Sequence, residues 1–137
     1  MEQYFNIGIV GNADSRFNEA SAENRLEQVF EEISKSYGST KINIISGATL
    51  CGIHKMLYPM AERFGYGTIG VMCKKGYDWK LYPVDELYAR GAEWGDESEL
   101  FIEKIDVLYR IGGGTQSRRE CQMARQKGIP VYEYELE

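Results

Sequence analysis

The sequence predicts an α/β fold, a three-layer sandwich in which a mainly parallel five-stranded sheet lies between two layers of helices. Short apolar runs alternate with longer charged stretches of helical periodicity along the chain. Three of the apolar runs end in turns that contain glycine and hydroxyl-bearing residues. Strands that alternate with helices form right-handed βαβ units and a sheet covered on both faces, as in Rossmann-like folds. At 137 residues the chain has the length of a single domain, which we expect to span residues 1–137.

The first half of the chain predicts two strand–helix units. Strands are expected over residues 4–10 and 41–45, where short apolar runs precede glycine-bearing turns. After the first strand, small and apolar residues recur at intervals of three and four positions and predict one buried helical stripe, formed by Ala22, Leu26, Val29, Phe30 and Ile33. The second predicted helix directs a similar set towards the core, namely Ile53, Leu57, Met60, Ala61 and Phe64.

The second half of the chain predicts three more strands, over residues 68–72, 106–111 and 130–134. A short helix over residues 97–104 precedes the second of these strands, and a helix that ends near residue 127 follows it. Alternation of strands and helices therefore continues to the last strand. The same parallel sheet is expected to contain all five strands.

The segment between residues 74 and 95 is rich in aromatic residues and shows no regular period. Loops of this length are usually functional or interfacial. One interpretation is a lid whose rings stack on a nucleobase, with Tyr77, Trp79 and Tyr82 as the candidates. The other is a contact between the subunits of a homodimer, where Tyr and Trp are also enriched. The two interpretations are compatible if the site lies at a subunit boundary.

Residues 106–120 carry the strongest functional signal, an apolar strand that stops at three consecutive glycines and continues into a helix. Glycine permits positive φ and a close approach of the backbone to a ligand. Thr115 and Ser117 can cap the helix, whose first N–H groups have no intrahelical acceptor and favour an anion. Arg118 and Arg119 add positive charge. The pattern predicts a phosphate cradle at residues 112–119, although a glycine turn that only lets strand and helix pack closely is the alternative.

Two other polar turns, at residues 11–16 and 46–52, follow the first and second predicted strands. In an open parallel sheet the ligand lies beyond the carboxyl ends of the strands, so the three turns are expected to converge. The predicted ligand-binding residues are Gly11, Ser15, Arg16, Ser46, Gly47, Thr49, Gly112, Gly113, Gly114, Thr115, Gln116, Ser117, Arg118 and Arg119.

Composition excludes several classes of partner. A net charge of −5 argues against a nucleic-acid polymer, because surfaces that follow a phosphate backbone are basic. Cys51, Cys73 and Cys121 are odd in number and far apart, so we expect no disulfide framework, no metal site and no resident cofactor. The sequence shows neither a signal-peptide pattern nor an apolar run of about twenty residues, which predicts a cytoplasmic protein that does not engage a membrane.

The chain resembles the SLOG superfamily, which contains the Lonely Guy cytokinin-activating phosphoribohydrolases, proteins formerly described as lysine decarboxylases, and nucleotide-sensing domains. Residues 7–11 with Ser15 and Arg16 look like the opening strand and ribose-phosphate loop of the family, and residues 45–52 look like its second glycine-rich turn. Residues 106–120 match the strand that leads into its Gly-Gly-x-Gly-Thr-x-x-Glu signature. The resemblance covers nearly the whole length and implies a homodimer.

The chain departs from the hydrolases of that superfamily at four positions. Gln116 and Ser117 stand where the hydrolases have Gly and Thr, and Gly112 stands where they usually have Pro. Glu97 stands where the hydrolases carry an Arg on the helix before the signature strand. The resemblance implies that hydrolysis needs the positive charge of this Arg, which is therefore absent or relocated in this chain.

Two functions from different classes follow. The first is nucleotide binding or sensing, in which the cradle holds a phosphate, Ser15 and Arg16 hold ribose or a second phosphate, and an aromatic ring stacks on the base. The second is an N-glycoside hydrolase or transferase acting on a nucleoside monophosphate, with Glu120 stabilising positive charge at the sugar. Glu120 would also complement the helix dipole without touching a substrate. His54 is expected to be a partly exposed helix residue rather than a general base, and a structural protein with a vestigial pocket is a third possibility.

Overall fold

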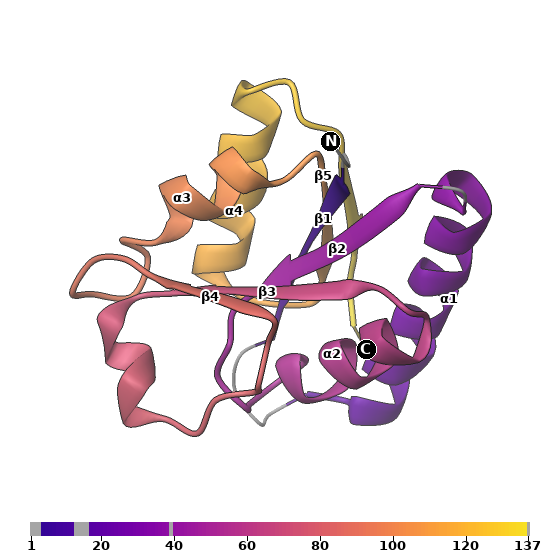
Figure 1. The fold of residues 1–137 in the computed structure, drawn as a ribbon. Helices are drawn as coiled ribbons and strands as arrows, with labels where there is room; N and C mark the ends of the chain where they lie inside the picture. The colour runs from indigo at the N-terminus through magenta and orange to yellow at the C-terminus, as the bar shows by residue number, and fades with distance from the viewer. Residues whose placement is uncertain (1–3, 13–16, 39, 137) are drawn as a thin grey trace.

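The computed structural model describes residues 4–12, 17–38 and 40–136. Its sheet consists of parallel strands in the order β4-β3-β2-β1-β5-β6 (Figure 1). The strands are β1 (Tyr4–Gly11), β2 (Lys41–Ser46), β3 (Gly67–Met72), β4 (Glu86–Ala89), β5 (Val107–Ile111) and β6 (Val131–Tyr134). The helices are α1 (Glu19–Tyr37), α2 (His54–Arg63), α3 (Ser98–Lys104) and α4 (Thr115–Gln126), with a 3-10 helix, η1, at Lys74–Asp78.

The sheet has six strands, so the expectation of five was wrong. The additional strand is β4, which lies inside the aromatic segment and pairs in parallel with β3, Ile69 opposite Glu86. Its four residues are exposed or half-buried, and it lies at the edge of the sheet. An edge strand this short lacks the continuous apolar run by which a buried parallel strand is detected.

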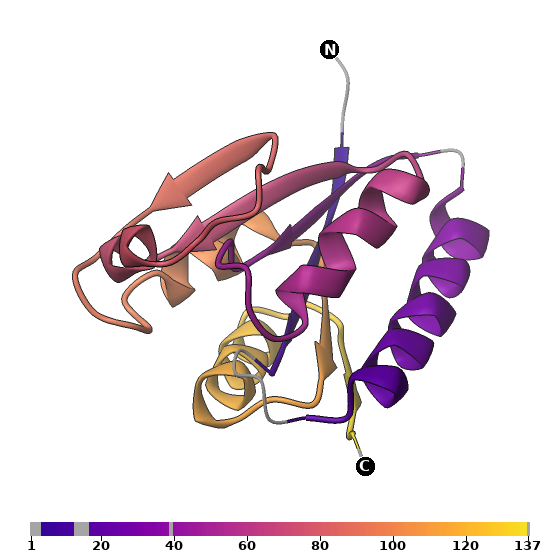
Figure 2. The ribbon, with the colours of Figure 1, turned by 90° about the horizontal axis from the view of Figure 1, so that it is seen from below.

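Helices cover both faces of the sheet, with α1 and α2 on one face and α3 and α4 on the other (Figures 1 and 2). The predicted stripe of α1 is confirmed, because Ala22, Leu26, Val29, Phe30 and Ile33 are all buried. Asn18 caps this helix by accepting a hydrogen bond from the Ser21 N–H at 3.0 Å. None of the described helices is both long and apolar enough to cross a membrane.

The chain order reverses between β1 and β5. From β1 the chain proceeds outward through β2 and β3 to β4, and it then returns to the other side of β1 to form β5 and β6. Gly11, at the carboxyl end of β1, pairs with Ile111, at the carboxyl end of β5. Crevices at such a reversal are the usual ligand sites of open parallel sheets. The turns after β1 and β5 are therefore neighbours at the expected site.

Candidate functional site

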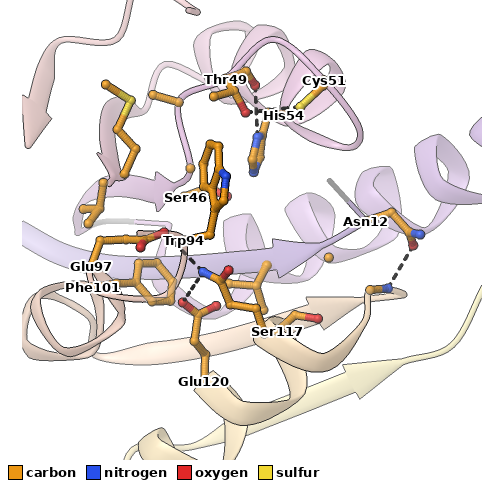
Figure 3. A pocket seen from close by; sticks show the side chains of 18 of the residues that line it. Asn12, Ser46, Thr49, Cys51, His54, Trp94, Glu97, Phe101, Ser117 and Glu120 are labelled. Atoms are coloured by element: carbon orange, nitrogen blue, oxygen red, sulfur yellow. Dashed lines mark hydrogen bonds between the residues drawn. The ribbon is translucent and has the colours of Figure 1, made fainter. Parts of the chain in front are cut away.

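A pocket of about 600 Å³ lies at the carboxyl ends of the central strands (Figure 3). It is lined by the turns after β1, β2 and β5, by the first turns of α4 and by the loop that precedes α3. The residues predicted from the sequence that line it are Gly11, Ser46, Gly47, Thr49, Gly113, Gly114, Thr115, Gln116, Ser117, Glu120 and Trp79. Ser15 and Arg16 lie outside the described residues.

The turn after β5 packs directly on the turn after β1. The Gly113 N–H donates a hydrogen bond of 2.8 Å to the Asn12 side-chain oxygen. Gly113 has φ +100, and a Cβ added there would lie 2.2 Å from Ser117 Oγ and 3.1 Å from the Gly11 backbone. Only glycine satisfies both conditions. The three consecutive glycines predicted a close approach of the backbone, and the turns after β1 and β5 do pack closely at Gly113.

The amino end of α4 faces the pocket without a side-chain cap. Gly114 is the residue before the first helical turn and makes no capping hydrogen bond. The expected capping by Thr115 or Ser117 was wrong, because Ser117 Oγ instead donates to the Gly114 carbonyl at 3.1 Å. The first N–H groups of a helix have no intrahelical acceptor and carry partial positive charge. They are available to a ligand in the pocket.

The arginines predicted for the cradle point elsewhere. Arg118 pairs with Glu135 at 3.1 Å, and Arg119 donates to the Gly95 carbonyl at 3.0 Å and to Ser98 Oγ at 3.2 Å. Neither arginine lines the pocket, and no Lys or Arg side chain of the described ranges does. In the described part of the chain the cradle consists of backbone, hydroxyl and amide groups.

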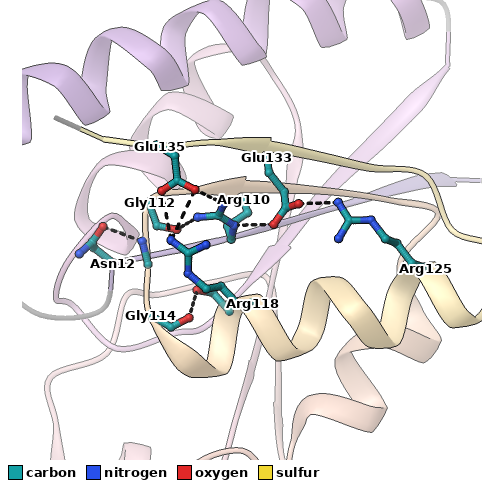
Figure 4. A network of polar contacts seen from close by, with 10 residues as sticks. Asn12, Arg110, Gly112, Gly114, Arg118, Arg125, Glu133 and Glu135 are labelled. Atoms are coloured by element: carbon teal, nitrogen blue, oxygen red, sulfur yellow. Dashed lines mark hydrogen bonds and ion pairs between the residues drawn. The ribbon is translucent and has the colours of Figure 1, made fainter.

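A buried arginine in the predicted apolar strand supports the turn after β5, together with Glu133 and Glu135 (Figure 4). Arg110 is 2% exposed, and its Nη1 donates to the Gly112 carbonyl at 2.7 Å. Two carboxylates hold it, Glu133 at 2.8 Å and Glu135 at 2.6 Å. The alternation of Glu133 and Glu135 was a usable signal, because residues two apart lie on the same face of an extended strand.

Two carboxylates lie together in the pocket. Glu120 is 5% exposed and Glu97 is 6% exposed. The Gln116 amide lies between them, 3.2 Å from Glu97 Oε2 and 3.4 Å from Glu120 Oε2. Ser98 Oγ donates to Glu120 at 2.7 Å, and the Gly95 N–H donates to Glu97 at 2.8 Å.

Burial raises the pKa of Glu120; hydrogen bonds from Ser98 and Gln116 oppose the rise, and the Glu97 carboxylate adds to it. A carboxyl group with a raised pKa inside a pocket can serve as an acid or as a stabiliser of positive charge. Glu97 thus occupies the pocket with a charge opposite to that of the hydrolase Arg. Its presence in the pocket was not predicted, because the resemblance indicates only that an Arg is missing at this position.

His54 also lines the pocket, and the expectation of a partly exposed helix residue was wrong. The side chain belongs to the buried class, and burial lowers its pKa to about 4 although a hydrogen bond to Thr49 opposes the change. Nδ1 lies 3.0 Å from the Thr49 carbonyl, which can only accept, so Nδ1 carries the proton and Nε2 carries a lone pair. Nε2 has no hydrogen-bond partner among the described residues.

The aromatic residues of the 74–95 segment divide into two groups. Trp79 and Trp94 line the pocket, each about half exposed. Tyr77 lies outside the pocket lining, and Tyr82 stacks on Tyr58 with ring centroids 5.1 Å apart. Trp94 was not among the predicted stacking residues, although its place three positions before Glu97 connects it to the same loop.

No family model matches the sequence, and no curated protein does. Solved structures do share the fold. The molybdenum cofactor binding protein from the phototrophic bacterium Rippkaea orientalis superposes with a TM-score of 0.77 at 18% identity, covering 96% of this chain and 76% of that one. The molybdenum cofactor carrier protein from Chlamydomonas reinhardtii matches with the same values. The protein TM1055 gives a TM-score of 0.71 at 17% identity, with 93% and 72% covered. At this identity the likeness shows the fold alone.

Proposed function

We propose that the pocket binds a nucleotide or a nucleotide-derived phosphate ligand. The observation that carries the proposal is the uncapped amino end of α4, which faces a pocket at the reversal of strand order, next to the turn after β1. Helix amino ends in such positions bind phosphate groups through free N–H groups and the helix dipole. That two solved structures with this fold belong to proteins named for the molybdenum cofactor supports a small-molecule ligand.

The phosphate occupies the cradle in this proposal, against the backbone of Gly113, Gly114 and Thr115. Ser15 and Arg16 hold ribose or a second phosphate, and Ser46, Gly47 and Thr49 form the opposite turn. Trp79 stacks on the base. Stacking by Tyr77 or Tyr82 stays a prediction, and it requires the 74–95 segment to change its packing. Arg118 reaches the ligand only by leaving Glu135, from which it is 3.1 Å away.

Cys51 provides a direct test, because it lines the pocket and is half-buried whereas Cys73 and Cys121 are buried. A ligand in the pocket should slow the alkylation of Cys51 by iodoacetamide, and mass spectrometry measures the rate of this alkylation. The probes are AMP, GMP, inorganic phosphate and the molybdenum cofactor. A saturating ligand at a hundred times its Kd also adds about 2.7 kcal/mol to the free energy of unfolding. A Cys51→Ser variant is the control and must lose the label. If none of the probes protects Cys51 from alkylation, the proposal is overturned.

N-glycoside hydrolysis of a nucleoside monophosphate is the second candidate function. The buried Glu120 in the pocket favours it, because its raised pKa is typical of catalytic carboxyl groups. Against it, no Lys or Arg of the described ranges lines the pocket, and Glu97 contributes a second negative charge. We therefore rank ligand binding first.

We further propose a cytoplasmic homodimer whose contact includes the aromatic segment. Tyr77 is 61% exposed, and Leu87 on the edge strand β4 is 38% exposed. Burying exposed aromatic and apolar side chains is the usual source of dimer stability. Sedimentation velocity at micromolar concentration tests the proposal, and a monomer there would contradict it.

A further inference from the structure

The pocket offers mainly hydrogen-bond acceptors on the sides away from the cradle. His54 Nε2 carries a lone pair and has no partner among the described residues. Glu97 points its carboxylate into the pocket from the loop before α3, with Glu120 beyond the Gln116 amide (Figure 3). Each carboxylate oxygen can accept more than one hydrogen bond. A ligand in this region therefore meets acceptors on two sides.

Three side-chain donors of the same region, on Ser46, Ser117 and Gln116, are already engaged. Among the described residues, the indole N–H groups of Trp79 and Trp94 are the donors that stay available. Ser46 Oγ donates to the Ile9 carbonyl, and Ser117 Oγ donates to the Gly114 carbonyl. The Gln116 amide is shared between the two carboxylates. A ligand that covers the His54 and Glu97 acceptors takes water away from them, so it binds best when it brings N–H or O–H groups of its own.

Charge then determines which way the ligand lies. A phosphate dianion beside Glu97 and Glu120 would face two carboxylates, whereas the amino end of α4 attracts it. These charges favour a ligand with its phosphate at the cradle and its ring system between Trp94, His54 and Glu97. Trp94 and Trp79 supply the flat apolar surfaces that a heterocycle requires.

We propose that the pocket selects a guanine-type ring, in which a ring N–H stands beside an exocyclic amino group, with Glu97 as the acceptor of both donors and His54 Nε2 as the acceptor of a further N–H or O–H. A carboxylate matches two parallel donors, whereas an adenine-type edge presents a ring nitrogen that only accepts and would face a carboxylate lone pair. The proposal rests on the proposed function, because it requires a phosphate-bearing ligand in this pocket.

The experiment compares GMP, IMP and XMP. IMP lacks the exocyclic amino group, and XMP replaces it with a carbonyl. Wild-type protein should bind GMP at least tenfold more tightly than IMP and should bind XMP weakest, measured by titration calorimetry and by protection of Cys51. Glu97→Gln replaces one acceptor by a donor, so it should weaken GMP at least tenfold, strengthen XMP and reverse or abolish the preference. Glu99→Gln, an exposed carboxylate on α3, is the matched control and should leave the order unchanged.

The outcomes separate the two proposals. If the nucleotides bind and protect Cys51 with equal affinity, or if Glu97→Gln leaves the GMP-to-XMP ratio unchanged, the ring assignment is overturned and the proposed function stands. If GMP, IMP and XMP all fail to bind the wild type, the ring assignment is overturned, and the proposed function is overturned with it only if AMP, inorganic phosphate and the molybdenum cofactor also fail to protect Cys51. The wild-type order of GMP, IMP and XMP requires no variant, so the proposal stays testable even if Glu97→Gln fails to fold.

Discussion

Arg110 Nη2 lies 2.6 Å from Glu135 Oε1, and this contact joins the middle of β5 to the end of the described chain. The same guanidinium binds Glu133 and the Gly112 carbonyl. Gly112 begins the turn after β5, which we propose as the phosphate cradle. A buried cation held by two carboxylates therefore fixes the carbonyl from which the cradle starts, while donating nothing to the pocket itself.

Removing both carboxylates should destabilise the protein strongly. The double variant Glu133→Gln with Glu135→Gln leaves the buried Arg110 without a counter-charge, so it should lower the free energy of unfolding by more than the loss of an exposed ion pair does. Urea unfolding at neutral pH measures the loss. Glu93→Gln, which removes only the exposed pair with Lys75, is the control and should change stability little. Equal losses in both proteins would show that Arg110 needs no counter-charge.

Gly113→Ala should destabilise the protein more than Gly128→Ala does. Both glycines have positive φ, so each substitution adds the strain of an L-residue there, about 1 kcal/mol. At Gly128 a Cβ meets nothing within 4 Å, whereas at Gly113 it would lie 2.2 Å from Ser117 Oγ. Thermal unfolding compares the two variants. Similar midpoints would mean that the turn after β5 has room to move away from Gly11.

Local patterns were sufficient for the repeating elements of the fold. The five predicted strands differ from β1, β2, β3, β5 and β6 by no more than one residue at either end, because buried parallel strands are continuous apolar runs. The stripe of α1 has the 3.6-residue period of a helix packed on one face. The convergence of three glycine turns followed from the rule that carboxyl ends of parallel strands share an edge.

The polar interior was not accessible to the same reasoning. Arg110 looked like an interruption of an apolar run, because its partners lie more than twenty residues away. His54 is buried because the turn at Gly47 leaves no Cβ beside its ring, where one would lie 2.6 Å from Cε1. Glu97 meets Glu120 only through Gln116 across two helices. Such contacts depend on tertiary packing. The alternation of Glu133 and Glu135 places two carboxylates on one face of their segment, but no local pattern says which residue they meet.

His54 should make stability depend on pH in the mildly acidic range. Its pKa is lowered from 6.5 to about 4 in the folded protein, so between these values the unfolded chain binds a proton that the folded chain does not. Stability is then full above pH 6.5 and falls as the pH decreases towards 4, by up to about 3 kcal/mol. Measuring the free energy of unfolding by urea at several pH values tests this dependence.

The contribution of His54 is obtained as a difference between two proteins. His54→Asn keeps an N–H donor for the Thr49 carbonyl but cannot titrate. Glu120, whose pKa is raised, acts in the opposite sense over part of this range, and it is present in both proteins. The free energy of unfolding of the wild type minus that of the variant should therefore rise between pH 4 and pH 6.5 and stay constant above pH 6.5. A flat difference would mean that His54 is protonated as readily in the folded protein as in the unfolded chain.

Glu120→Gln separates ligand binding from hydrolysis. The amide keeps the shape of the side chain and an oxygen that can accept from Ser98 Oγ, which now lies 2.7 Å from the carboxylate. It removes the charge that would stabilise an oxocarbenium-like sugar. A hydrolase would lose most of its turnover, whereas a binding protein would keep its affinity within a few fold.

We expect the wild type to release little or no free base from nucleoside monophosphates, because the described pocket lining contains no Lys or Arg and Glu97 adds a carboxylate there. Chromatography of the reaction mixture measures free base, and protection of Cys51 measures occupancy in the same samples. Glu103→Gln, an exposed carboxylate on α3, is the control for a general effect of charge. If the wild type releases base rapidly, and Glu120→Gln loses this activity while Glu103→Gln keeps it, our ranking is reversed. A protein that only binds its ligand would release no base.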